Sequence, residues 1–221
     1  MWQSSSQVAD PFERFLEKYT LRPNGQQPGP VWREPYLVAQ GGYCELAEQF
    51  AGCSFEEGLY RLHDATTGPQ ALELIVDVFP QFAHRVSPFG FDWLGRQFAI
   101  DHERRESGAA LVLMLEPGTG EALEIPASFL SFHDEELVSY ADAALAIYFF
   151  AEWSMGPTSQ LPLSADQCVG YRVPLFLGGR DVIDNLEVVD IDVYWSICGQ
   201  LKNGTVELPV GASIKGISAR R

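Results

Sequence analysis

The chemically most distinctive stretch of this sequence is a series of acidic residues that follows the pair Gly178-Gly179. Its spacing lacks the alternating aspartates and the glycine of a calcium loop. It also lacks the glycine-lysine pattern of a phosphate loop, and its carboxylates would repel a phosphate. The pattern indicates either a solvated acidic surface or a docking patch for a basic partner protein. The residues of this series are Asp181, Asp184, Glu187, Asp190 and Asp192.

A second acidic patch lies upstream and consists of Asp134, Glu135 and Glu136. If either patch binds a protein, charge steers the encounter and aromatic side chains anchor the complex. Candidate anchors are Trp93 and Trp195, although Trp195 lies within a stretch that favours a buried helix, which makes a core position the preferred interpretation.

Acid–base chemistry has one local candidate, the pair Asp101-His102, with His133 as a distant third member. A charged strand end explains the pair equally well. His63, His84, His102 and His133 are scattered, with no HExxH motif, and no GxSxG motif marks a serine nucleophile. We therefore expect no catalytic residue, no metal site and no cofactor, and keep an enzyme with a site assembled from Asp101, His102 and His133 as the weakest alternative.

The acidic series lies within the segment 168–201, around which the chain is organised. An apolar run over 169–177 predicts a strand that ends at the glycine pair, since glycine accepts the positive φ of a tight turn. The spacing of Val193, Tyr194, Ile197, Cys198 and Leu201 then predicts one buried face of a helix. We expect a strand, a glycine turn, an acidic loop and a buried helix.

The remaining elements follow from periodicity and turn residues. We expect a short helix after Asp10-Pro11, an irregular segment over 21–35, and helices over 128–137 and 141–153. Helical spacing also occurs over 43–50 and 54–63, with a strand at the end of 54–63 as the alternative. The stretch 70–82 fits a helix or a strand. Short apolar runs between glycines over 84–128 predict antiparallel strands. The predicted fold class is α+β, a central antiparallel sheet with helices before and after it.

The composition restricts the partners. Fifteen basic against thirty acidic residues give a net charge of −15, which disfavours direct binding to nucleic acid or to anionic membranes and favours a basic protein. We expect a cytoplasmic protein, since we find no secretory signal and no apolar run of about 20 residues that could span a membrane. The four cysteines stand singly, without a CxxC pair, and are expected to be reduced.

The succession from Val173 to Leu201 resembles the C-terminal signature of an immunity-protein family of bacterial type VI secretion. In that family an apolar strand runs into LGG, then an Asn-Leu pair, then a helix that ends in Gln-Leu. Upstream segments extend the resemblance over residues 85–201, and the chain is more distantly similar to the SUKH superfamily of toxin-immunity proteins. The matching positions are Leu177, Gly178, Gly179, Asn185, Leu186, Gln200 and Leu201.

The resemblance implies a GAD-like helical segment over 1–84, an immunity-type α+β domain over 85–208 and a peripheral tail over 209–221, or one compact domain overall. It implies an antitoxin that binds a cognate secreted toxin, in one branch a DNase, and occludes its active site without catalytic residues of its own. The alternative is a SUKH-like binding or regulatory scaffold that neutralises no toxin. Stoichiometry and oligomeric state do not follow from the sequence.

Overall fold

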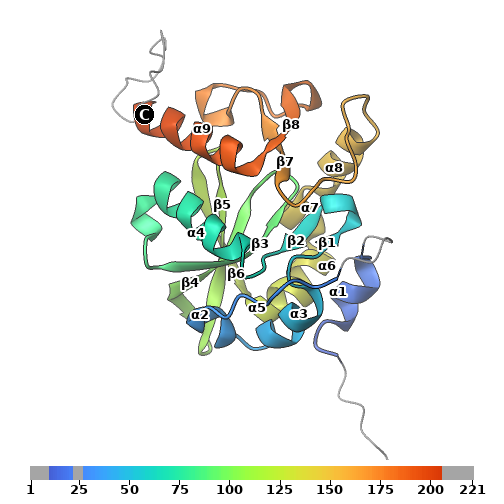
Figure 1. Cartoon of the computed structure of the whole chain (residues 1–221), viewed down its shortest axis with the longest axis vertical. Helices are drawn as coiled ribbons and strands as arrows, with labels where there is room; N and C mark the ends of the chain where they lie inside the picture. Colours follow the sequence, from blue (N-terminus) through green and yellow to red (C-terminus); the bar gives the residue numbers. More distant parts are fainter. Residues whose placement is uncertain (1–9, 22–26, 206–221) are drawn as a thin grey trace, which may run out of the picture.

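A computed structural model describes residues 10–21 and 27–205 of the chain. Its centre is a six-stranded antiparallel sheet in which every strand pairs with its sequence neighbours (Figure 1). The strands are β1 (Ser54–Phe55), β2 (Tyr60–Leu62), β3 (Val86–Asp92), β4 (Gln97–Glu106), β5 (Ala109–Glu116) and β6 (Glu121–Ser128). The predicted α+β class and central antiparallel sheet are confirmed.

Helices precede and follow this sheet, and one interrupts it in chain order. The first group is α1 (Glu13–Lys18), α2 (Pro35–Val38) and α3 (Tyr43–Phe50), and α4 (Thr67–Val78) lies between β2 and β3. The second group is α5 (Phe129–Ser131), the π-helical turn η3 (Phe132–Glu136), α6 (Leu137–Ser139), α7 (Ala141–Leu145) and α8 (Ile147–Ser154). A two-stranded antiparallel sheet, β7 (Gln167–Tyr171) and β8 (Leu186–Asp190), leads into α9 (Ile191–Thr205).

Both faces of the large sheet are buried, which explains the unbroken apolar run of β5. Val112 and Met114 face a core shared with Phe15, Phe129 and Trp153 from the surrounding helices. Leu113 and Leu115, which alternate with them, face a second core formed with α4 and α9. Successive strand side chains point to opposite faces, so a strand covered on both sides reads as continuously hydrophobic.

Several expectations for single elements are wrong. The segment 54–63 forms β1 and β2, so the strand alternative for its end is right and the helical interpretation is wrong, because its apolar side chains pair across a hairpin. The strand predicted over 169–177 is β7 and ends at Tyr171, and β8 was not predicted. In α9, Val193 and Ile197 are about half exposed (48% and 49%), so the buried face is shifted to Tyr194, Trp195 and Cys198.

Other expectations are confirmed. The stretch 70–82, left open between a helix and a strand, forms most of α4 and a following 3-10 turn over Pro80–Phe82. The predicted helix start at Ser128 is a capping box in which Ser131 N donates to Ser128 Oγ at 3.2 Å. Trp195 is fully buried, as preferred from the sequence. The four cysteines are free. The tail over 209–221 lies outside the described residues.

The segments expected to form separate units are joined by hydrogen-bonded strands in the described part of the chain. Tyr60, Arg61 and Leu62 of β2 pair with β3, across the boundary expected near residue 84. Asp134 of η3 accepts hydrogen bonds from the backbone N–H groups of Arg14 and Phe15 in α1, at 3.1 and 3.3 Å. How the chain divides into domains stays a prediction.

Candidate functional site

The acidic series of the sequence is exposed but does not converge on one point. Asp181 accepts a hydrogen bond from the Tyr171 hydroxyl at 2.7 Å. Glu187 forms an ion pair with Arg172 at 3.5 Å, in which both side chains are about half exposed. Asp184 lines a shallow hollow beside the glycine pair. These three carboxylates belong to β8 and to the loop between β7 and β8.

The other two members of the series lie at the start of α9. The Asp190 carboxylate accepts hydrogen bonds from the backbone N–H groups of Asp192 and Val193, at 3.0 and 3.1 Å, which caps the helix. Asp192 lies at the mouth of a small cavity next to His63. One of these two acids therefore has a clear structural role, whether or not it also contacts a partner.

The upstream patch is separated from the series. Asp134 holds the start of α1, Glu135 is exposed, and Glu136 is partly buried on η3. Figure 1 shows α1 in the lower part of the molecule and β8 and α9 at its top. The two acidic patches of the sequence are thus two different surfaces.

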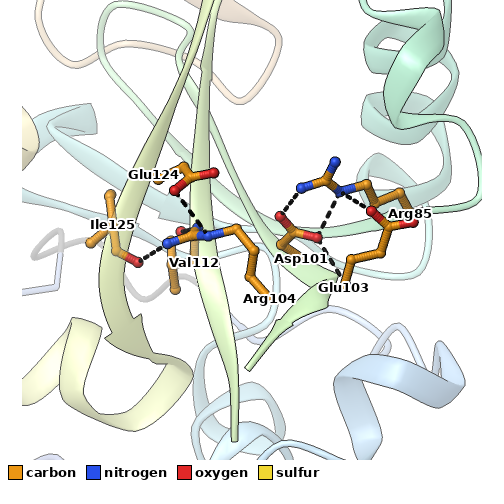
Figure 2. Close-up of polar contacts among 7 residues, drawn as sticks. All are labelled: Arg85, Asp101, Glu103, Arg104, Val112, Glu124 and Ile125. Atoms are coloured by element: carbon orange, nitrogen blue, oxygen red, sulfur yellow. Dashed lines mark hydrogen bonds and ion pairs between the residues drawn. The ribbon is translucent and has the colours of Figure 1, made fainter. Parts of the chain in front are cut away.

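The candidate acid–base residues have separate partners. Figure 2 shows Asp101, on β4, in a two-point ion pair with Arg85, whose Nε and Nη2 donate to its carboxylate at 2.9 and 2.6 Å. Burial raises the pKa of Asp101, but the hydrogen bonds and charge of Arg85 lower it further, below its ordinary value. Arg104, in the same figure, donates to the carbonyl of Val112 at 3.0 Å and pairs with Glu124 at 3.3 Å.

His102 and His133 are held in other networks. His102 hydrogen-bonds Ser87 at 2.8 Å and stacks on Tyr36, with 3.6 Å between ring centres. His133 is fully buried, where its Nδ1 donates to the Phe129 carbonyl and its Nε2 accepts from the Tyr60 hydroxyl, both at 2.8 Å. Burial lowers its pKa to about 4. The structure therefore gives no shared site to Asp101, His102 and His133.

A groove of about 490 Å³ lies between α7–α8 on one side and β7, the β3–β4 turn and the end of β5 on the other. We call it the acidic groove. Four carboxylates from four separate segments line it, and none of them takes part in an ion pair within residues 10–21 and 27–205. They are Glu116, Asp142, Glu152 and Asp181.

The floor of the acidic groove is held by a buried ion pair. Arg96, which lines the groove, donates through Nε to Asp92 at 2.6 Å and through Nη2 to the Ala144 carbonyl at 3.0 Å. Asp92 also accepts from the backbone N–H groups of Leu94 and Arg96, both at 3.0 Å. The hydrogen bonds of the guanidinium therefore go to Asp92 and to α7. Its ion pair is with Asp92 and not with a carboxylate of the groove.

Glu116 is the most enclosed of the four carboxylates. Burial raises its pKa above the ordinary value, Arg96 opposes this rise, and the negative charges of Asp92 and Asp181 add to it. A cation entering the groove would relieve both the desolvation and the repulsion. The groove therefore has the electrostatics of a site for a positively charged group.

Aromatic side chains lie beside these acids because the helix predicted over 141–153 is broken. Ala146 adopts a left-handed conformation with a φ of 50°, and the Asp142 carboxylate accepts from the Tyr148 backbone N–H at 3.1 Å on the far side of the break. α8 consequently presents Tyr148, which is 73% exposed, at the groove, while Phe149 packs on Trp93. Exposed aromatic faces next to carboxylates suit lysine and arginine side chains.

The sequence identified only Asp181 of this groove. Glu116, Asp142, Glu152 and Tyr148 were missed, because they become neighbours only through the fold. The available signal was the stretch IYFFAEWSM, in which four aromatic residues flank the acid Glu152, because aromatic residues are enriched at protein interfaces. The anchor role considered for Trp93 is wrong, since that side chain is fully buried and donates to the Leu145 carbonyl at 2.9 Å.

Within 10–21 and 27–205 there is no group of three or more His, Cys, Asp or Glu side chains that could hold a metal ion. Among the helices described for this chain, none is long and apolar enough to cross a membrane.

Part of the chain matches the model of a known protein family. Residues 134–202 match the model of the C-terminal region of the T6SS immunity protein Tdi1, which confirms the resemblance predicted from the sequence to the type VI secretion immunity family for this segment. The segment contains eleven acidic and three basic residues, a net charge of −8 out of the chain's −15. It also contributes Asp142, Tyr148, Glu152 and Asp181 to the acidic groove.

The other comparisons concern whole chains. No curated protein matches this chain. Among solved structures, the crystal structure of Atu4351 from Agrobacterium tumefaciens is similar, with a TM-score of 0.56 and 16% sequence identity over 86% of this chain and 88% of that chain. At this identity, the likeness concerns the fold alone.

Proposed function

We propose that this protein is a cytoplasmic immunity protein that binds a cognate type VI secretion toxin through the acidic groove and occludes the toxin's active site. The observation that carries this proposal is that the segment similar to the Tdi1 immunity region also supplies most of the groove's exposed acids and its exposed tyrosine. Immunity proteins act by binding, so the chain needs no catalytic residues for this role.

The charge of the groove favours a basic partner. Because Arg96 is committed to Asp92 and Ala144, the groove carboxylates retain their negative potential. A toxin that cleaves nucleic acid must offer basic residues to phosphates, and an acidic surface can take their place. A DNase is therefore the class of toxin that we favour. In this proposal Asp181 is the main contact residue of the acidic series, and Asp184 and Glu187 contribute to the same interface.

The other acidic residues predicted from the sequence to bind the partner remain proposals, which we place after the groove residues. Asp190 and Asp192 lie at the start of α9, and Asp134, Glu135 and Glu136 lie on η3. Asp134 and Asp190 are engaged in hydrogen bonds to backbone N–H groups, so their substitution would disturb the fold as well as any interface. The groove residues are cleaner probes of binding.

The test is co-expression with the product of the neighbouring open reading frame, scored by survival of the host and by co-purification at low and high salt. Rescue together with a stable complex that weakens at high salt supports the proposal. A toxic neighbour that this protein neither binds nor neutralises contradicts it. A complex without neutralisation favours the SUKH-like scaffold.

A further inference from the structure

A second cavity, distinct from the acidic groove, lies between α4, the large sheet and the start of α9. We call it the α4 cavity. Its volume is about 120 Å³, and its walls are the apolar side chains of Ala71, Leu74, Phe91 and Ile191. Pockets for cofactors and drug-sized ligands usually measure about 300–1,000 Å³. The space therefore suits a short aliphatic chain better than a ring system.

The floor of the α4 cavity is polar but uncharged. His63 and Gln97 are 4% and 1% exposed, and the Nε2 of His63 lies 2.8 Å from the Gln97 side-chain oxygen, which it contacts as a donor. The Nδ1 of His63 lies 3.1 Å from the Thr67 hydroxyl. Burial lowers the pKa of His63 to about 4, so the ring is neutral at pH 7. The floor therefore does not repel a cation.

The mouth of the α4 cavity is acidic. Asp166 and Asp192 line it and are exposed, and the Ile191 N–H donates to the Asp166 carbonyl at 2.8 Å, which holds the two segments together. Partial burial and the charges of Asp190 and Asp166 raise the pKa of Asp192. Within residues 10–21 and 27–205, neither Asp166 nor Asp192 forms an ion pair.

Arg61 is a cation close to the cavity, but its guanidinium is hydrogen-bonded to groups other than the Asp166 and Asp192 carboxylates. Its guanidinium lies over the Phe91 ring and donates to the carbonyls of Ser164, Gln167 and Asp92, at 2.6–3.2 Å. The N–H groups of this guanidinium are therefore used by backbone carbonyls and not by the aspartates at the mouth. The carboxylates of Asp166 and Asp192 thus keep a net negative charge next to an apolar hole.

We propose that the α4 cavity binds a lysine or arginine side chain of a partner protein. The methylene groups of that side chain would lie against Leu74, Phe91 and Ile191, and its charged end would meet Asp166 and Asp192, as long cationic side chains do when their stems are buried. An anion would be repelled at this mouth, and a neutral apolar group would leave both carboxylates unpaired. That the partner is the toxin rests on the proposed function.

The experiment uses the full-length, isotope-labelled protein and follows the NMR signals of His63 and Leu74 during titration with n-butylammonium and n-butylguanidinium chloride. Saturable shifts at these residues are expected, with much weaker binding of n-butanol. Asp166→Asn/Asp192→Asn should weaken binding of the cations roughly tenfold, since one exposed ion pair contributes up to about a factor of five. Glu106→Gln/Glu135→Gln makes the same charge change at two exposed residues that do not line the cavity and should leave the affinity unchanged.

The proposal is overturned if the cations bind no better than n-butanol, if the shifts occur outside the cavity, or if the double variant keeps full affinity. Should the double variant fail to fold, Asp192→Asn alone replaces it, because removing this charge relieves repulsion from Asp190 and Asp166. The probes need no toxin. A failed rescue assay would therefore contradict the proposed function without affecting this test. Failure of the probes to bind would contradict the α4 cavity proposal without affecting the acidic groove proposal.

Discussion

The guanidinium of Arg96 and the carboxylate of Asp92 form a buried ion pair beneath the acidic groove, with 2.5 Å between Arg96 Nη2 and the nearer oxygen. The two residues flank a turn in which Gly95 has a φ of 74°. Because Arg96 also donates to the Ala144 carbonyl, the pair ties the β3–β4 turn to α7. The groove is therefore anchored to the large sheet, whose strands position its floor.

Replacement of Asp92 tests this anchor. Asp92→Asn leaves the Arg96 guanidinium buried without its counter-charge, which typically costs about 3–5 kcal/mol. We expect urea denaturation to show a loss of this size in the free energy of unfolding. Asp184→Asn, at an exposed carboxylate, should change it by no more than about 0.5 kcal/mol. An equal effect of the two substitutions would show that the pair does not stabilise the fold.

Neutralising the exposed acids of the groove should slow association with the toxin. Glu152→Gln/Asp181→Asn keeps the side-chain shapes and removes two negative charges from the surface that steers a basic partner. We expect a lower association rate and a weaker salt dependence by surface plasmon resonance, with an unchanged melting temperature. Glu73→Gln/Glu106→Gln is the matched control. Identical rates for the two variants would place the toxin elsewhere.

The exposed ring of Tyr148 should act as an anchor. Tyr148→Ala removes a side chain that is 73% exposed, so the stability of the free protein should change by less than about 0.5 kcal/mol. Interface aromatic residues often contribute more than 1 kcal/mol, and we expect dissociation of the complex to accelerate about tenfold. Tyr140→Ala, on a tyrosine that is 61% exposed outside the groove, should have little effect. Faster dissociation from both variants would contradict a specific anchor.

The buried histidines should make the fold sensitive to mild acid. The pKa of His63 and of His133 is lowered to about 4 in the folded state, whereas an unfolded histidine titrates near 6.5. Between these values the unfolded chain binds protons that the folded chain excludes, so stability is complete above about pH 6.5 and falls as the pH decreases towards 4. At pH 5 each histidine should account for a loss of about 2 kcal/mol.

Urea denaturation at pH 7 and pH 5 measures this loss. Glu116 and Asp192, whose pKa values are raised, act in the opposite direction and should reduce the total. His133→Gln should lower stability at pH 7 and shrink the difference between the two pH values by about 2 kcal/mol. His84→Gln, at an exposed histidine, should leave the difference unchanged. A profile that His133→Gln does not flatten would contradict the predicted neutral, buried ring.

The sequence by itself determined the features that depend on local pattern. The capping serine at Ser128, the antiparallel strands between glycines, and the buried Trp195 were all predictable, because each depends on near neighbours along the chain. The resemblance of the C-terminal segment to an immunity family was also readable there. Local reasoning left a helix and a strand open at the end of 54–63, and hairpin pairing, which the spacing alone does not reveal, decided for strands.

Only the tertiary structure decided which acids form one surface. Asp181 lies beside Glu116, Asp142 and Glu152, while its sequence neighbours Asp190 and Asp192 lie at the start of α9. At the break at Ala146, which sets where Tyr148 points, the Tyr148 backbone N–H donates a hydrogen bond to the Asp142 carboxylate, and no periodicity reveals this bond. The Coulomb energy between carboxylates depends on their distance in space and not on their separation along the chain. A charged surface is therefore defined only when the strands and helices that carry it have packed.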